Sequence, residues 1–159
     1  MKKILPIILI LSLFLTGCGK EEILDGSVDL DLTIQEREGA IGKSNKDFTE
    51  LTNSKPSTVR NDVTEKWRKI TLSKSIDINE YLLSYNKLYM TDEPSAVHWI
   101  INFNHNTTTS ISDMGDYLYV TVHEYVDKEE HDAKVLGNGM VIGEFNIYKD
   151  NGDIMKAGD

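Results

Sequence analysis

Residues 77–90 carry apolar side chains at helical spacing. These side chains recur every three or four positions and would share one face of a helix: Ile78, Tyr81, Leu82, Tyr85, Leu88 and Tyr89. Asp77 can cap the start, and Glu80 stands three residues later, as in a capping box. Pro94 follows the last periodic position, near Met90. The spacing therefore predicts one helix of roughly four turns.

Beyond Pro94 the chain changes to a two-residue alternation of apolar and polar side chains. This pattern is typical of strands with one buried face. It covers residues 97–104, 117–126 and 141–148. Residues 107–112 predict a further strand because they are rich in β-branched side chains, and residues 154–156 predict another because they follow a hairpin turn. Turn residues at 113–116 and 150–153 and a charged loop at 127–139 separate neighbouring segments. Strands joined in this way form an antiparallel meander.

The chain before the helix is less regular. Residues 28–34 alternate strictly and predict a first strand. Residues from about 35 to 60 are rich in Gly, Ser, Asn and Thr, and they predict a long loop with one helical turn near residues 47–51. Residues 64–73 leave a helix and a strand both open, because their apolar positions fit neither period.

These patterns together predict an α+β domain. The main helix, at about 77–90, would pack on one face of a twisted antiparallel β-sheet of four to six strands. A single domain over residues 28–159 is expected, because a chain of this length forms one core more readily than two.

The first eighteen residues have a different character. Lys2 and Lys3 precede an apolar run, residues 4–14, that is shorter than the ~20 residues of a membrane-spanning helix. The run ends in Leu15-Thr16-Gly17-Cys18. These four positions match a lipobox, and the stretch resembles a bacterial lipoprotein signal peptide. The resemblance implies that residues 1–17 are cleaved and that the sulfur of Cys18 is lipidated.

The lipid on Cys18 would attach the protein to the cell membrane, facing outside the cytoplasm. Residues 18–27 would then form a tether. Cys18 is the only cysteine, so intramolecular disulfides and thiolate metal clusters are excluded. The net charge is −9, and loss of Lys2 and Lys3 makes it −11. Such an acidic chain is a poor partner for nucleic acid.

The sequence lacks the usual signatures of catalysis and metal binding. Its four histidines, at 98, 105, 123 and 131, have no metal-ligand spacing, and the alternation places His98 and His123 on a solvent face. The acidic runs at 127–132 and 150–153 lack the ligand spacing of an EF-hand. Gly-x-Ser-x-Gly and phosphate-binding glycine loops are absent. We therefore expect no enzymatic activity, no catalytic residue, no metal site and no cofactor.

Tyr117, Tyr119 and Tyr125 fall on one face of a predicted strand, opposite apolar residues. Either the N-terminal loop covers these rings, or they are exposed and available to a partner. The two alternatives stay open at this point.

Three further segments resemble a family of uncharacterised small lipoproteins of low-GC Gram-positive bacteria. They are residues 61–64 with Trp67 and Arg68, residues 97–109, and residues 120–127 with 129–134. The resemblance implies no activity or ligand. It does suggest that the Glu-Glu-His-Asp-Ala-Lys loop is a recurring pattern, which makes Glu129, Glu130, His131 and Asp132 candidate partner-binding residues.

We therefore expect a non-enzymatic lipoprotein that binds another protein or an envelope component. The alternatives are an accessory lipoprotein that binds a small molecule or a cation, and a hydrolase.

Overall fold

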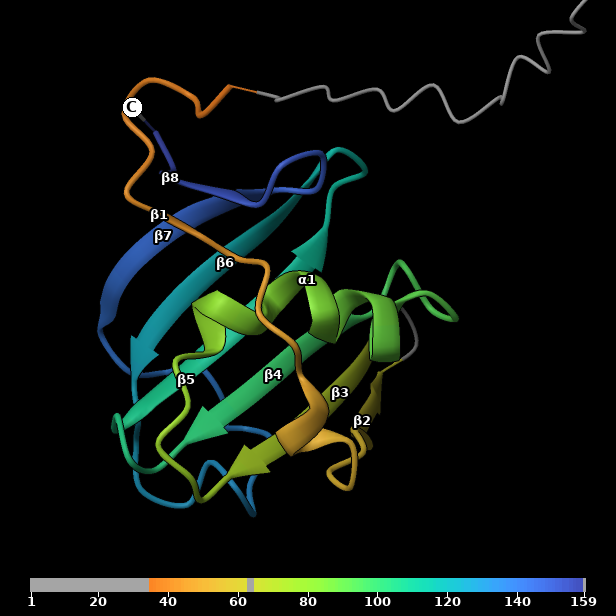
Figure 1. Ribbon diagram of the computed structural model, residues 1–159. Coiled ribbons are helices and arrows are strands. Elements are labelled where there is room, and N and C mark those ends of the chain that lie inside the picture. The colour runs from red at the N-terminus through yellow and green to blue at the C-terminus, as the bar shows by residue number, and fades with distance from the viewer. Residues whose placement is uncertain (1–34, 63–64, 159) are drawn as a thin grey trace, which may run out of the picture. The chain divides into compact units, whose positions relative to one another are not determined.

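The computed structural model describes residues 35–62 and 65–158 (Figure 1). Four expectations fall outside these residues: the signal peptide, the lipidation of Cys18, the tether at residues 18–27 and the strand at residues 28–34. No helix in the described ranges is long and apolar enough to cross a membrane.

One mixed sheet dominates the described chain. Its strands are β1 Gly42–Lys43, β2 Ser57–Asp62, β3 Glu65–Leu72, β4 Val97–Asn102, β5 Thr107–Asp113, β6 Tyr117–Glu124, β7 Val141–Tyr148 and β8 Asp153–Lys156. They lie in the order β1-β8-β7-β6-β5-β4-β3-β2. The strands from β4 to β8 form the antiparallel meander that the alternation predicts.

The α+β class is confirmed, but the expected strand count and the purely antiparallel pairing are wrong. The described sheet has eight strands, and β3 pairs with β4 in parallel. The ambiguous residues 64–73 contain β3, so the helix that follows is the crossover between two parallel strands. The expected long loop contains β1 and the start of β2 as well as the predicted helical turn, Thr49–Leu51.

The helical segment changes its hydrogen-bonding pattern along its length. It consists of a 3₁₀ turn η2, Ile78–Tyr81, an α-helical turn α1, Leu82–Tyr85, and a π-helical turn η3, Asn86–Met90. The Asp77 side chain caps it by accepting from the backbone N–H of Asn79 at 3.0 Å. Glu80, the expected capping-box partner, instead pairs with Lys46 at 2.5 Å.

The core lies between this helical segment and the sheet (Figure 1). Leu82 and Tyr85 are fully buried against Ile100, Leu118 and Ile147. Phe48 closes the core from the N-terminal side, with its ring edge-on to that of Tyr85. The largest buried apolar residues are Phe48, Leu72, Leu82, Tyr85, Met90, Ile100, Ile101, Ile111, Leu118 and Ile147.

Two expectations about burial are wrong. Leu88, expected on the buried helix face, is 49% exposed. His98, expected on a solvent face, is 1% exposed. Its Nδ1 forms a hydrogen bond of 2.8 Å with the Tyr85 hydroxyl. The strand face that carries His98 also carries Ile100, and the helical segment covers that face.

Candidate functional site

We call the sheet face opposite the helical segment the outer face. Because strand residues alternate between faces, Leu118 and Val120 point into the core and Tyr117 and Tyr119 lie on the outer face. The register sets Tyr117 opposite Tyr148 of β7, with ring centroids 5.8 Å apart. Tyr117, Tyr119 and Tyr148 together are named the tyrosine patch.

The tyrosine patch is only partly covered. The Arg37 guanidinium lies over the Tyr148 ring, 3.8 Å from its centroid, so the N-terminal loop shields one of the three rings. Tyr117 and Tyr119 are partly buried. Tyr119 donates its hydroxyl proton to Glu144 Oε1 at 2.7 Å at the surface of the protein. This hydrogen bond raises the pKa of Tyr119, and burial contributes further. The two expected alternatives, tyrosines covered by the N-terminal loop and tyrosines exposed to a partner, therefore each hold in part.

Tyr125 belongs to a second cluster at the opposite end of β6. Eight residues of extended chain separate it from Tyr117, which corresponds to about 25 Å. Its hydroxyl donates to Glu130, and its ring stands edge-on to Phe103 at 5.4 Å. The hydrogen bond to Glu130 is the main cause that raises the pKa of Tyr125 to about 12. Glu130 also lies 3.4 Å from His131, whose side chain is 80% exposed. The three tyrosines therefore do not form one surface.

Glu129 lies in the interior, which removes it from the expected partner-binding surface. Its side chain is fully buried. One carboxylate oxygen accepts the Thr108 hydroxyl from β5, and the other accepts the Gly137 N–H at 3.2 Å. Glu129 thus joins both ends of its own loop to the sheet. Asp132, by contrast, is exposed and accepts from the Lys134 N–H at 2.9 Å.

Residues 125–140, named the covering loop, lie over part of the outer face. Lys69 of β3 donates to the Glu130 carbonyl, and desolvation lowers the pKa of Lys69. Gly137 has φ +72°, and a β-carbon there would stand 2.4 Å from the Trp99 ring. Trp99 in turn stacks on Trp67 at 5.6 Å. The covering loop is therefore fitted closely to the indole of Trp99.

The described histidines do not converge. His98 is buried, His105 and His131 are exposed, and His123 approaches the Gly139 carbonyl at 3.2 Å beneath the covering loop. Within residues 35–62 and 65–158, no three His, Cys, Asp or Glu side chains are placed to hold one metal ion.

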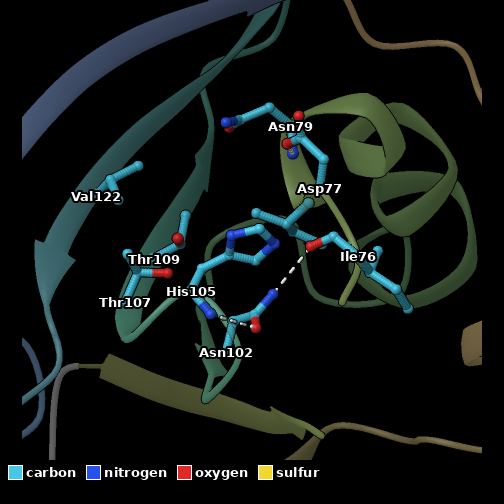
Figure 2. Close-up of a pocket in the computed structure, with 9 residues that line it drawn as sticks. Ile76, Asp77, Asn79, Asn102, His105, Thr107, Thr109 and Val122 are labelled. Atoms are coloured by element: carbon cyan, nitrogen blue, oxygen red, sulfur yellow. Dashed lines mark hydrogen bonds between the residues drawn. The ribbon is translucent and has the colours of Figure 1, made fainter. Parts of the chain in front are cut away.

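A small cavity opens on the other face of the sheet, beside the start of the helical segment. Its volume is about 200 Å³. Figure 2 shows Asp77 and Asn79 approaching it from the helical side and Thr107, Thr109 and Val122 from the strands. Asn102 braces the floor by donating to the Ile76 carbonyl at 2.9 Å and by accepting from the His105 N–H at 3.2 Å.

The cavity has polar groups able to bind a ligand. Asn79 Oδ1 is buried there with no hydrogen-bond partner among the described residues. The exposed Asp77 and His105 add a carboxylate and an imidazole at the rim. Typical ligand pockets measure ~300–1,000 Å³. The cavity can therefore hold only a molecule of a few heavy atoms.

Sequence reasoning did not identify this cavity or the Trp67–Trp99 pair. Thr107 and Thr109 were part of a β-branched strand signal, and Asp77 was a helix cap. No spacing in the sequence connects these residues, because the pairing of β4 with β5 brings them beside the start of the helical segment.

No protein-family model, curated protein or solved structure matches this chain. The fold itself defines an α+β domain in which one helical segment covers a mixed eight-stranded sheet of the described residues.

Proposed function

We propose that this chain is a membrane-anchored, extracytoplasmic binding module without enzymatic activity, and that the tyrosine patch contacts a protein partner. The observation that carries the proposal is the position of Tyr117 and Tyr119, partly exposed on the outer face and not covered by the covering loop. The anchor rests on the lipobox at residues 15–18.

Tyrosine suits such a surface because its ring buries a large apolar area while its hydroxyl keeps a polar partner. The Tyr119 hydroxyl already has one partner in Glu144, which fixes the ring for contact. Arg37, which lies over Tyr148, adds a guanidinium to the edge of the patch. Aromatic residues and arginine are the types most enriched at binding hot spots.

The anchor is tested by cell fractionation. Cys18→Ala should release the protein from the membrane fraction and stop processing before residue 18. Gly17→Ala is the matched control, because the lipobox pattern accepts Gly or Ala at that position. A Cys18→Ala chain that remains membrane-bound and mature-sized would contradict the anchor.

The binding surface is tested with the full chain in detergent. A partner cross-linked from envelope extracts should be identified by mass spectrometry, purified and titrated against three proteins: wild type, Tyr119→Ala and Tyr125→Ala. Loss of partner binding in Tyr119→Ala alone supports the tyrosine patch as the binding surface. Loss of binding in Tyr125→Ala alone assigns the binding surface to the cluster of Tyr125, Glu130 and His131. Equal affinity of all three proteins rejects both surfaces.

A second candidate function is binding of a small polar molecule. It is favoured by the buried Asn79 Oδ1 that lacks a partner in the cavity of Figure 2. A small-molecule screen by thermal shift should then find a compound whose stabilisation disappears in Asn79→Ala. If Asn79→Ala keeps the stabilisation, the compound binds elsewhere.

A further inference from the structure

The first residues of β7 form an edge of the sheet that has no neighbouring strand among the residues that the structure describes. Within β7, the residues that pair with β8 are Phe145, Asn146 and Ile147, and the Ala157 N–H donates to the Glu144 carbonyl. For residues 141–143 the described pairing is on the β6 side alone. Figure 1 agrees, since β8 and β1 lie beside the other end of β7.

This edge is apolar and strongly exposed. Met140 is 67% exposed, Val141 50% and Ile142 57%. Natural proteins usually protect an open edge with a charged residue or a proline, since unpaired main-chain groups recruit other strands. Residues 140–143 contain neither. Neither of these residue types therefore protects this part of the β7 edge.

A groove of about 310 Å³ runs beside the same edge. It is lined by Val141, Ile142, Gly143, Glu144, Phe145, Lys156 and Ala157. Gly143 helps to form it, because a β-carbon there would meet the Phe145 ring at 2.8 Å. A bulge at Ile142 gives β7 one extra residue relative to β6. The molecule thus combines open main-chain groups with a side-chain groove.

We propose that the β7 edge binds an extended peptide segment of another protein by strand addition. The segment would hydrogen-bond to the main chain of residues 141–143 and place an apolar side chain in the groove. Strand addition gives affinity through the main chain and specificity through pockets for alternate side chains. The proposal shares with the function above only the need for a protein partner.

A second copy of this chain fits the edge poorly. A stable protein interface uses roughly 20–30 residues on each side, and the open edge and its groove comprise only residues 140–145 and 156–157. Two copies would also bring together chains of net charge −9. A short flexible peptide has neither difficulty, because a few main-chain bonds and one groove can hold it.

The test uses the full chain in detergent and an end-blocked seven-residue peptide that alternates valine and threonine between two lysines. Amide hydrogen exchange with the peptide should slow at residues 141–144. Ile142→Lys should weaken binding at least about tenfold, because it places a charge on the edge. Met114→Lys is the matched control: Met114 is 55% exposed in the turn between β5 and β6, and this variant should bind normally. Should Ile142→Lys fail to fold, Met140→Glu replaces it.

Several results would overturn the proposal. The peptide could fail to bind, or a peptide with proline at its central position could bind equally well. Ile142→Lys could bind the peptide with unchanged affinity, or the slowed amide exchange could fall at residues 117–119 instead of 141–144. Concentration-dependent dimers that Ile142→Lys abolishes would assign the edge to a second copy. Peptide binding that survives Tyr119→Ala separates this edge from the tyrosine patch, so either proposal can fail alone.

Discussion

The Tyr85 hydroxyl and His98 Nδ1 lie 2.8 Å apart in the core and connect the helical segment to β4. Both side chains are buried, at 0% and 1% exposure. His98 Nε2 has no hydrogen-bond partner among the described residues. Either neutral tautomer of the imidazole can make this hydrogen bond, because Nδ1 can accept from the Tyr85 hydroxyl or donate to it. The burial of the ring disfavours the charged form of His98.

Stability should fall as the pH drops from about 6.5 to 4. Burial and, to a lesser degree, the positive charge of Arg68 lower the pKa of His98, Glu93 partly offsets them, and the net pKa is about 4. The unfolded chain therefore binds the proton first, and each step of acidification through this window favours unfolding. The full effect is on the order of 3 kcal/mol. Urea unfolding at a series of pH values measures it.

His98→Gln removes the titrating group and keeps an acceptor for Tyr85. This variant should lose the slope between pH 6.5 and 4, while His131→Gln, at an 80% exposed side chain, should keep it. An unchanged slope in His98→Gln would assign the acid sensitivity to another group.

The packing of Gly137 against Trp99 predicts a specific cost for a single methyl group. Gly137→Ala combines a left-handed backbone with a clash against the Trp99 ring, so it should destabilise by about 2–4 kcal/mol. Gly115→Ala also has a positive φ, but nothing lies within 4 Å of the added carbon, and its cost should be about 1–2 kcal/mol. Trp67 and Trp99 are the only two tryptophans, so their fluorescence reports on the covering loop directly. Equal costs for the two variants would refute the clash.

Glu129 should be more important for stability than its position in a charged loop suggests. Glu129→Ala leaves the Thr108 hydroxyl and the Gly137 N–H unpaired, which should cost about 2–4 kcal/mol. Combined with Thr108→Val, the two changes should cost less than their sum. Glu124→Ala, at an exposed carboxylate, should stay within about 0.5 kcal/mol of wild type. Strict additivity of Glu129→Ala and Thr108→Val would mean that the two residues do not interact.

The elements that local periodicity defines were predictable from the sequence. The helical segment and the strands of the meander follow it, because each has one face in the core. The prediction for β3 stayed open because its apolar positions fit neither period. β4 was predicted as a strand, but its faces were harder to assign because both of them are covered. Ile70 and Ile100 face the helical segment, while Ile101, on the other face of β4, is fully buried as well. A two-sided strand has no solvent face, so the rule that places polar residues outside failed for His98.

The candidate site shows the same limit. The alternation placed Tyr117 and Tyr119 correctly on one face, because that information is local. Glu129 could not be recognised as buried, since its partner Thr108 is 21 residues away. The open edge at Ile142 is equally non-local, because it exists only where β8 stops pairing with β7.

The lowered pKa of Asp153 predicts a second loss of stability at lower pH, separate from that of His98. Burial alone would raise the pKa of this fully buried carboxyl, but hydrogen bonds from Lys43, the Arg37 N–H and Asn151 outweigh burial and lower the pKa to about 2. A carboxyl with a lowered pKa stabilises the fold above its ordinary value, 3.8, and this contribution is lost as the pH falls towards 2. The loss should be on the order of 2 kcal/mol, reduced by the partial exposure of Lys43. Protonation of His98 lowers stability above pH 4, and protonation of Asp153 lowers it below pH 4. His98→Gln and Asp153→Asn should therefore each remove a different part of the dependence of stability on pH. A single variant that removes both parts would show that the two sites are coupled.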